Sequence, residues 1–549
     1  MLLVERGLML AVPIAGGQGT FGIQSESHVC VNRLRQPPDN TAARHVPVNL
    51  MSLTRQSRLL LPLAAPLTLL LLAACAVGPN FKRPAAPPVS DYTAHPKSST
   101  VATADTAGGA AQRFAKGGDL AADWWTLFHS AALNALIDQS LDRNPDLKAA
   151  QAALSVAREN VLAQRGVYYP SVVADFSATR QRQSGQISPT LNSNAFLFNL
   201  FTPEVTVSYL PDVFGLNRRT VESLQAQEQG MRFQMLATYT TLTSNVVVAA
   251  IQAGSLQMQV DATRRLIASN TEALQILRYQ LTKGYASQLD VSAHESQLAQ
   301  LAATLPPLVK QLAQLHDLLA VLTGRFPSEA PDESFDLATL QLPEELPVSL
   351  PSALVAQRPD VLQAEANLHD ASAKIGIAIA NRLPSFPLTA NAGSSAAVFS
   401  QLFSGGTGFW GVGVDATAPL FEGGQLLHQE RAAKAAYTQA AEQYRSTVLA
   451  AFQNVADTLT ALEQDAESLK AAKTAADAAK VTRDLAQRQW RDGYANYLSL
   501  LNAEQADQQS QIALVQAQAS RYADTAALFQ ALGGGWWNRT DLTTGKYAK

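Results

Sequence analysis

Two motifs have the residue types that proton transfer or cofactor binding would need. The adjacent carboxylates Asp332-Glu333 and Glu344-Glu345 could exchange protons, but they lie in a proline-rich linker, where solvated charge is the more common role. Residues 406–411 have the G-x-G-x-x-G spacing of a dinucleotide site. That spacing holds a pyrophosphate only between a strand and a helix N-terminus. Here it runs into an alternating strand pattern, which favours a flexible turn.

The chain shows no spacing typical of a metal centre or an activated nucleophile. Its eight histidines never form a spaced pair suited to a metal. Neither a phosphate-binding P-loop nor a Gly-x-Ser-x-Gly elbow occurs. The net charge of −3 indicates no nucleic-acid partner. We therefore predict no enzyme, no cofactor and no metal site.

One cysteine has the context of a modification site. The apolar run 59–74 follows Arg55 and Arg58 and leads into the letters LAAC at 72–75, which is the order of a lipoprotein signal. Cleavage before Cys75 would leave its thiol to carry a diacylglycerol, with palmitate as a typical acyl chain. The alternative is a short apolar anchor that meets a buried cysteine. We predict lipidation of Cys75. The next residue, Ala76, is not Asp, and the resemblance to such lipoproteins then implies sorting to the outer membrane.

The signal divides the N-terminal part of the chain. Met51 begins an ordinary signal peptide, so we expect residues 1–50 to be a spurious extension and residues 51–74 to be the signal peptide. Residues 75–120 are rich in Pro, Ala, Thr and Gly, which predicts an extended, lipid-anchored tether.

The remainder of the chain is a duplication. Short landmarks recur in the same order, and they predict one repeat over 121–343, a second over 344–535 and a tail over 536–549. The landmarks are Asn144-Pro145-Asp146 with Arg358-Pro359-Asp360, Pro170-Ser171 with Pro384-Ser385, and Gly284-Tyr285-Ala286 with Gly493-Tyr494-Ala495.

Each repeat predicts a helix, two strands, a very long helix and a return helix. The long segments contain no proline, and at 1.5 Å per residue they would span roughly 100 Å. Pro306-Pro307 should interrupt the first return helix. The expected helices cover 145–165, 216–283 and 289–322 in the first repeat, and 359–382, 426–492 and 498–532 in the second. A coiled-coil rod and a hollow helical tube both fit their apolar spacing.

Four segments alternate between apolar and other residues, which is the pattern of a strand. They lie at 172–180, 204–209, 388–393 and 410–417. A soluble sheet with one wet face and an outer-membrane barrel both produce this alternation. Lipidation favours the barrel, and because spanning barrels need about eight strands or more, several chains would have to share one sheet.

Several further segments together resemble one family. Residues 75–84, the tryptophans in 123–128, and residues 318–324, 358–361, 453–457 and 531–536 are similar to NodT-type outer-membrane efflux lipoproteins, the TolC-like outer-membrane factors. The resemblance implies an α+β membrane protein, built mostly of long helices that form a periplasmic helical barrel. It also implies that four strands per chain form a shared, trimeric twelve-stranded outer-membrane β-barrel.

The same resemblance implies a function. The chain would be the outer-membrane exit duct of a tripartite efflux pump, a homotrimer that passively exports small toxic compounds or drugs. An inner-membrane pump would feed it through a periplasmic adaptor. It would lie in the cell outer membrane, anchored by lipid and extending into the periplasm. A type I protein-secretion duct and a lipid-anchored coiled-coil scaffold without a pore are the alternatives.

The resemblance also places candidate functional residues at the two hairpin tips, 281–291 and 490–502. The alternative is that both tips are ordinary helix-hairpin turns. The residues expected to contact the adaptor are Gly284, Ser287, Leu289, Asp290 and Val291 on the first tip, and Gly493, Tyr497, Leu498 and Leu500 on the second.

A gate at the periplasmic entrance is the last expectation from the resemblance. In some relatives carboxylates on the second tip ring this entrance, but the matching positions here, Ser499 and Asn502, are uncharged. Asp290 on the first tip and Asp492 on the second remain. We therefore predict a weak acidic ring, with a constriction held more by packing and hydrogen bonds.

Overall fold

A computed structural model describes residues 76–182, 197–329, 335 and 337–540. The proposed extension 1–50, the signal 51–74, Cys75, the Asp332-Glu333 pair and most of the tail lie outside the described residues. The described first half contains helices α2 (Ala131–Arg143), α3 (Pro145–Gly166), α4 (Leu216–Thr282) and α5 (Gln288–Leu322). The second half contains α6 (Pro351–Gln357), α7 (Pro359–Ala380), α8 (Gln425–Arg491) and α9 (Tyr497–Ala531).

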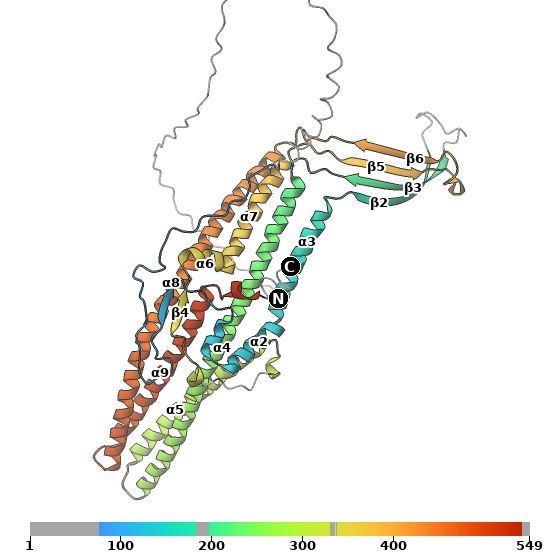
Figure 1. Cartoon of the computed structure of the whole chain (residues 1–549). Helices are drawn as coiled ribbons and strands as arrows, with labels where there is room; N and C mark the ends of the chain where they lie inside the picture. Colours follow the sequence, from blue (N-terminus) through green and yellow to red (C-terminus); the bar gives the residue numbers. More distant parts are fainter. Residues whose placement is uncertain (1–75, 183–196, 330–334, 336, 541–549) are drawn as a thin grey trace, which may run out of the picture. The chain divides into compact units, whose positions relative to one another are not determined.

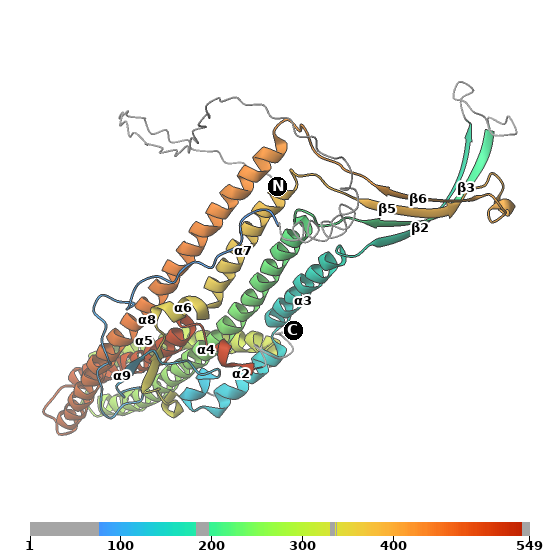
Figure 2. The ribbon, with the colours of Figure 1, turned by 45° about the horizontal axis from the view of Figure 1, so that its top comes forward.

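The long helices confirm the prediction from the proline-free segments. Helices α4 and α8 each have 67 residues, and the return helices α5 and α9 each have 35. Helices α3, α4, α7 and α8 lie side by side in that order, since each contacts the next (Figures 1 and 2). The two halves therefore contribute matching pairs of helices to one layer.

The predicted interruption at Pro306-Pro307 is wrong. Helix α5 continues through both prolines. Two carbonyls four residues earlier, those of Ala302 and Ala303, lose their N–H partners there. Both prolines are exposed, so water can bind to the freed carbonyls on this helix face.

The four alternating segments form one antiparallel sheet, in the order β2-β3-β5-β6. Its strands are β2 (Ser171–Arg182), β3 (Leu197–Tyr209), β5 (Leu388–Ser394) and β6 (Gly408–Val414). The sheet projects from the end of the helical layer (Figure 2). Strand β2 follows α3 and strand β6 precedes α8, so the two edge strands continue into the two edge helices.

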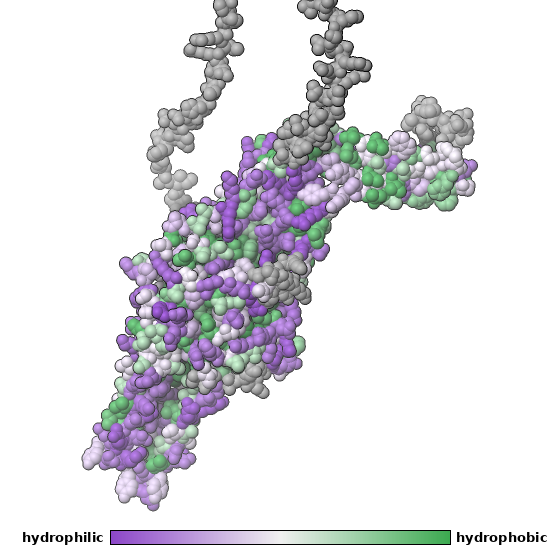
Figure 3. Space-filling model, viewed as in Figure 1, coloured by the Kyte–Doolittle hydropathy of each residue, from purple (hydrophilic) through white to green (hydrophobic). Residues whose placement is uncertain are grey.

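The register places apolar side chains on one face of this sheet. Ala174, Val205, Ala392 and Trp410 lie opposite one another in a single row across the four strands. Val412 and Val414 on β6 share the apolar face, and 76% and 68% of their surfaces are exposed. Hydrophobic residues gather visibly on the sheet in Figure 3. A continuous apolar face left uncovered in one chain indicates a contact with a membrane or another chain.

The segment after Cys75 corrects the predicted tether. Residues 76–120 are largely extended, but they lie against the helices rather than hanging free. Strand β1 (Arg113–Lys116) pairs in parallel with β4 (Glu345–Val348), a small second sheet that we did not predict. These strands have only four residues each, too few for a clear alternating pattern. We call residues 76–120 the strap.

A buried arginine fastens the strap to the last long helix. The Arg521 side chain on α9 is completely buried, and its guanidinium donates to the carbonyl oxygens of Gly108 (2.7 Å) and Ala110 (2.9 Å). Next to this contact, Trp124, Phe128, Tyr522 and Phe529 form an aromatic core. The strap is therefore an integral part of the folded body.

No helix in the described part of the chain has both the length and the apolar character needed to cross a bilayer.

Candidate functional site at the hairpin tips

The two hairpin tips are built in the same way. At the first tip α4 ends at Thr282 and α5 begins at Gln288, and at the second α8 ends at Arg491 and α9 begins at Tyr497. Gly284 and Gly493 have φ angles of 78° and 79°. Only glycine adopts this left-handed conformation without strain, so both glycines are required for the reversal of the chain.

Different side chains cap the two return helices. At the first tip the Ser287 hydroxyl accepts the backbone N–H of Asp290 (3.1 Å), and a carboxylate oxygen of Asp290 accepts the Ser287 N–H (2.9 Å). This reciprocal pair is a capping box. At the second tip the Asn496 side-chain oxygen accepts the N–H (2.9 Å) and the hydroxyl (2.7 Å) of Ser499.

The capping box sets the ionisation of the Asp290 carboxyl. Hydrogen bonds from the Ser287 hydroxyl and backbone N–H lower the pKa of Asp290 below its usual value, because they stabilise the carboxylate form. The first tip therefore carries a negative charge that also serves as a helix cap. In the second tip the equivalent cap is neutral.

Several expected contact residues are buried instead of exposed. Val291, Tyr497 and Leu500 are only 3%, 7% and 3% exposed, so these side chains lie beneath the surface of the tips and not on it. They belong to a cluster that joins the two hairpins, which we call the tip core. Its members are Leu274, Leu277 and Val291 of the first hairpin, and Tyr497, Leu500 and Leu501 of the second.

A buried polar network crosses the tip core. The ring of His294 on α5 is completely buried, with Nδ1 at 2.7 Å from the Tyr497 hydroxyl and Nε2 at 2.8 Å from the carbonyl oxygen of Asn270 on α4. Both contacts are satisfied when Nε2–H donates to the carbonyl and Nδ1 accepts the tyrosine proton. Burial, and then the nearby Glu504 carboxylate, raise the pKa of Tyr497, which keeps its hydroxyl protonated as a donor.

The most exposed apolar side chains of the tips form a matching set. Tyr285 and Leu289 on the first tip are 84% and 78% exposed, and Tyr494 and Leu498 on the second are 87% and 53% exposed. We predicted the two leucines and missed the two tyrosines. The repeated Gly-Tyr-Ala triplet was the signal that could have identified them.

The predicted gate residues are distributed over both tips. Asp492 is the exposed C-cap of α8, and Asn502 is exposed on the second turn of α9. Asp290 and Ser499 take part in the caps described above. Within the described residues, no group of three or more His, Cys, Asp or Glu side chains is arranged to hold a metal ion. The tips therefore offer apolar contact, hydrogen bonding and a small number of charges.

Comparison with known proteins identifies the family. The outer membrane efflux protein family matches residues 136–325 and 350–534. The chain is 31% identical over 483 residues to the probable efflux pump outer membrane protein TtgC of Pseudomonas putida, covering 87% of this chain and 96% of the relative. It is 28% identical to the outer membrane protein OprJ of Pseudomonas aeruginosa, covering 86% of this chain and 95% of OprJ.

Solved structures agree with this assignment. The outer-membrane channel OprN superimposes with a TM-score of 0.73 at 26% identity, covering 84% of this chain and all of OprN. The Campylobacter jejuni CmeC channel has the same fold, with a TM-score of 0.76 at 20% identity over 85% of this chain and 97% of CmeC. The chain therefore belongs to the outer membrane efflux protein family, and it is an outer-membrane exit duct.

Proposed function

We propose that three copies of this chain close into one duct, which a periplasmic adaptor connects to an inner-membrane pump. The observation that carries the proposal is the pair of open edges. Strand β2 is exposed along all 12 residues, and β6 is the opposite edge of the sheet. Pairing β6 of one chain with β2 of the next, and α8 with α3, gives a head-to-tail contact that closes into a ring.

The number of strands supports a trimer. One chain contributes four strands to the sheet, which is fewer than the roughly eight of the smallest spanning barrels. Three chains give twelve. The apolar faces of their sheets would then contact lipid, and the faces with Asp175, Ser177 and Asn391 would line the lumen.

The cargo is inferred from the relatives. Their names include a toluene efflux pump, an antibiotic efflux pump and a solvent efflux pump of Pseudomonas putida. We infer small toxic compounds or drugs as the exported class, moving passively from periplasm to exterior.

The adaptor is proposed to dock on the exposed tip residues. Tyr285, Leu289, Tyr494 and Leu498 would supply the apolar contacts, next to Gly284, Ser287 and Gly493 in the turns. Val291, Tyr497 and Leu500 would support this surface from beneath, in the tip core. Asp290 and Asp492 would form the weak acidic ring of the gate, with Ser499 and Asn502 as neutral members, and the His294–Tyr497 link would hold the constriction.

A lipid on Cys75 fits the place where the strap begins. The backbone N–H of Val77 donates to the carbonyl of Phe214 (3.0 Å), between β3 and α4. The buried Arg219 guanidinium holds the carbonyls of Val77 (3.0 Å) and Gly78 (3.2 Å). An acyl chain on Cys75, two residues before Val77, would then enter the membrane at the rim of the sheet. We propose a mature chain divided into 75–120, 121–343, 344–535 and a tail.

Planar-bilayer recording of the purified mature protein, together with its mass in detergent, tests this function. A trimer with a small, steady conductance is expected, because the tip core keeps each chain's hairpins together. A monomer without conductance would contradict the duct and favour the non-pore scaffold. Loss of resistance to toluene in a deletion strain, with protein secretion unchanged, would separate efflux from the type I secretion alternative.

A further inference from the structure

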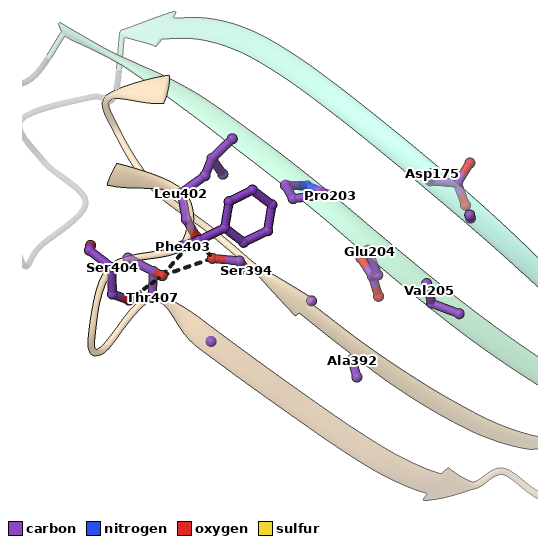
Figure 4. A pocket seen from close by; sticks show the side chains of 13 residues that line it. Asp175, Pro203, Glu204, Val205, Ala392, Ser394, Leu402, Phe403, Ser404 and Thr407 are labelled. Carbon is purple, nitrogen blue, oxygen red and sulfur yellow. Dashed lines mark hydrogen bonds between the residues drawn. The ribbon is translucent and has the colours of Figure 1, made fainter. Parts of the chain in front are cut away.

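A groove crosses the apolar face of the sheet beneath the connection between β5 and β6 (Figure 4). Its volume is about 480 Å³. The small side chains of Ala174 and Ala392 and the side chain of Val205, which share one row, form its floor. Leu402 and Phe403 of the connection form one wall. Asp175 and Glu204 also line the groove, but the register turns these two positions to the opposite face from Ala174 and Val205. Hydrocarbon therefore dominates the lining on the apolar face, which contacts the bilayer if the proposed trimeric barrel forms, and the inference below rests on that proposed function.

Hydrogen bonds hold this wall in place. The Thr407 hydroxyl lies 2.9 Å from the carbonyl oxygens of both Leu402 and Ser404, and the Ser394 hydroxyl lies 2.8 Å from it. Leu402 is 3% exposed, whereas the neighbouring Phe403 is 88% exposed. The connection is thus folded on itself, and it leaves one large aromatic side chain uncovered beside the groove.

A second aromatic contact extends the apolar surface along the sheet. Phe399 of the same connection packs against Phe176 on β2 and Phe201 on β3, with ring centroids 6.4 and 5.6 Å apart. Phe176 is 58% exposed and Phe399 is 62% exposed. These rings lie on the same face as Ala174, further from the helices. The apolar surface therefore continues from the groove towards the outer end of the strands.

Two arginines follow on this face. Arg180 and Arg182 alternate with Thr179 and Gln181, so the register places them on the face of Ala174 and Phe176, and both are exposed. Six residues of strand separate Ala174 from Arg180, which is about 20 Å along the strand. Strands of spanning barrels tilt by about 40° from the membrane normal, so this length corresponds to about 15 Å measured across the membrane. That is the thickness of the hydrocarbon of one leaflet.

We propose that this face binds one outer-leaflet lipid per chain. The lipid's phosphate contacts Arg180 and Arg182. One of its acyl chains runs from there across Phe176 and ends in the groove, beside Phe403. Guanidinium groups bind phosphate with two parallel hydrogen bonds, and small floor residues admit a hydrocarbon chain. Because the strands rise away from the helices, the arginines lie at the external end. The lipid is accordingly a phosphorylated, acylated glycolipid of the lipid A type.

Native mass spectrometry of the purified full mature protein tests this site, with diphosphoryl lipid A as the titrated probe. One retained lipid per chain is expected. The double variant Arg180→Gln/Arg182→Gln should weaken retention about tenfold, as expected for losing about 1.4 kcal/mol of charge-assisted hydrogen bonding. Ala174→Phe fills the groove and should weaken retention by a similar factor.

Matched controls separate the site from general effects. Arg265→Gln removes an exposed arginine on α4, and Val172→Phe enlarges a side chain on the same face outside the groove. Both should retain lipid A like the unaltered protein, in assemblies of unchanged mass. Unchanged retention by the arginine double variant, or by Ala174→Phe, would overturn the site. Equal retention of phosphatidylglycerol would overturn its assignment to an outer-leaflet glycolipid.

Discussion

The first hairpin tip, between α4 and α5, and the second, between α8 and α9, can be compared position by position. Both reverse at a left-handed glycine, and both expose one tyrosine and one leucine. They differ in the cap, which is a charged Ser287–Asp290 box in the first and a neutral Asn496–Ser499 pair in the second. The duplication therefore preserved the shape of the tip while the charge of its cap diverged.

The contact between the tips is also unequal. The first hairpin supplies His294 and the carbonyl of Asn270, and the second supplies the hydroxyl of Tyr497. Each hairpin thus supplies different groups to this donor–acceptor chain. Divergence of the two copies thus produced a specific interaction between them, and the following predictions test how much each side contributes.

The largest effect is expected from Tyr497→Ala. Removing this buried ring leaves a cavity in the tip core and an unpaired Nδ1 on His294, which should weaken the contact between the tips by about 3–5 kcal/mol. Hydrogen exchange over 281–291 and 490–502 should accelerate, and the single-channel conductance should rise. Tyr494→Ala, which alters an 87% exposed side chain, is the control and should change neither. Equal effects of the two variants would contradict the tip core.

A smaller effect is expected from Tyr497→Phe, which keeps the ring and removes the hydroxyl. His294 Nδ1 then loses its donor inside the core, at a cost of about 1–3 kcal/mol. Adding His294→Leu should recover part of that loss, because both members of the Tyr497–His294 pair are then apolar, and the recovery is incomplete because the Asn270 carbonyl loses the Nε2–H donor. Hydrogen-exchange rates of Tyr497→Phe, His294→Leu and the double variant together give the coupling energy between the two side chains. Strictly additive effects would show that the hydrogen bond contributes nothing.

The caps should differ in their pH dependence. Ser287→Ala and Asn496→Ala should each destabilise their own return helix by about 1 kcal/mol at neutral pH. The lowered pKa of Asp290 means that its stabilisation is complete above the unfolded value of about 3.9 and is lost as the pH falls through the lower folded value. Hydrogen exchange, corrected for intrinsic rates, should show acid-induced opening at the first tip only. Parallel opening of both tips would disprove the difference.

The smallest effect concerns ion selectivity. Replacing Asp290 and Asp492 together by asparagine should lower the cation preference of the conductance by no more than about twofold, because exposed charges are screened by salt. Ser499→Ala should leave it unchanged. Reversal potentials under a salt gradient at low ionic strength measure both. Strong cation selectivity that Ser499→Ala abolishes would reverse the relative importance of the two tips.

Local sequence patterns predicted most of the architecture. The absence of proline from 216–283 and 426–492 predicted α4 and α8, and alternation predicted β2, β3, β5 and β6. Such patterns depend on neighbours along the chain, so they were readable without a structure. The continuous helix at Pro306-Pro307 could not be predicted in this way, because it depends on solvent access to one helix face.

The tip core could not be predicted from the sequence, for a related reason. His294 and Tyr497 are separated by 203 residues, and only Tyr497 lies in a segment that the family resemblance singled out. Their pairing depends on the lateral packing of α5 and α9, which periodicity does not specify. Val291 and Leu500 matched the family pattern for the same positions, yet that pattern did not distinguish a surface contact from a supporting core.

The buried Arg521 has a consequence for the order of biogenesis. Its contact with Gly108 joins residues 413 positions apart, near the two ends of the mature chain. If the chain is exported from N-terminus to C-terminus, the strap emerges first, and the part of α9 that it contacts emerges last. In a chain that ends before α9, the carbonyls of Gly108 and Ala110 would lack their arginine donor. Docking of the strap therefore has to wait until α9 is present, so the N-terminal segment of the folded body is completed by one of its last helices.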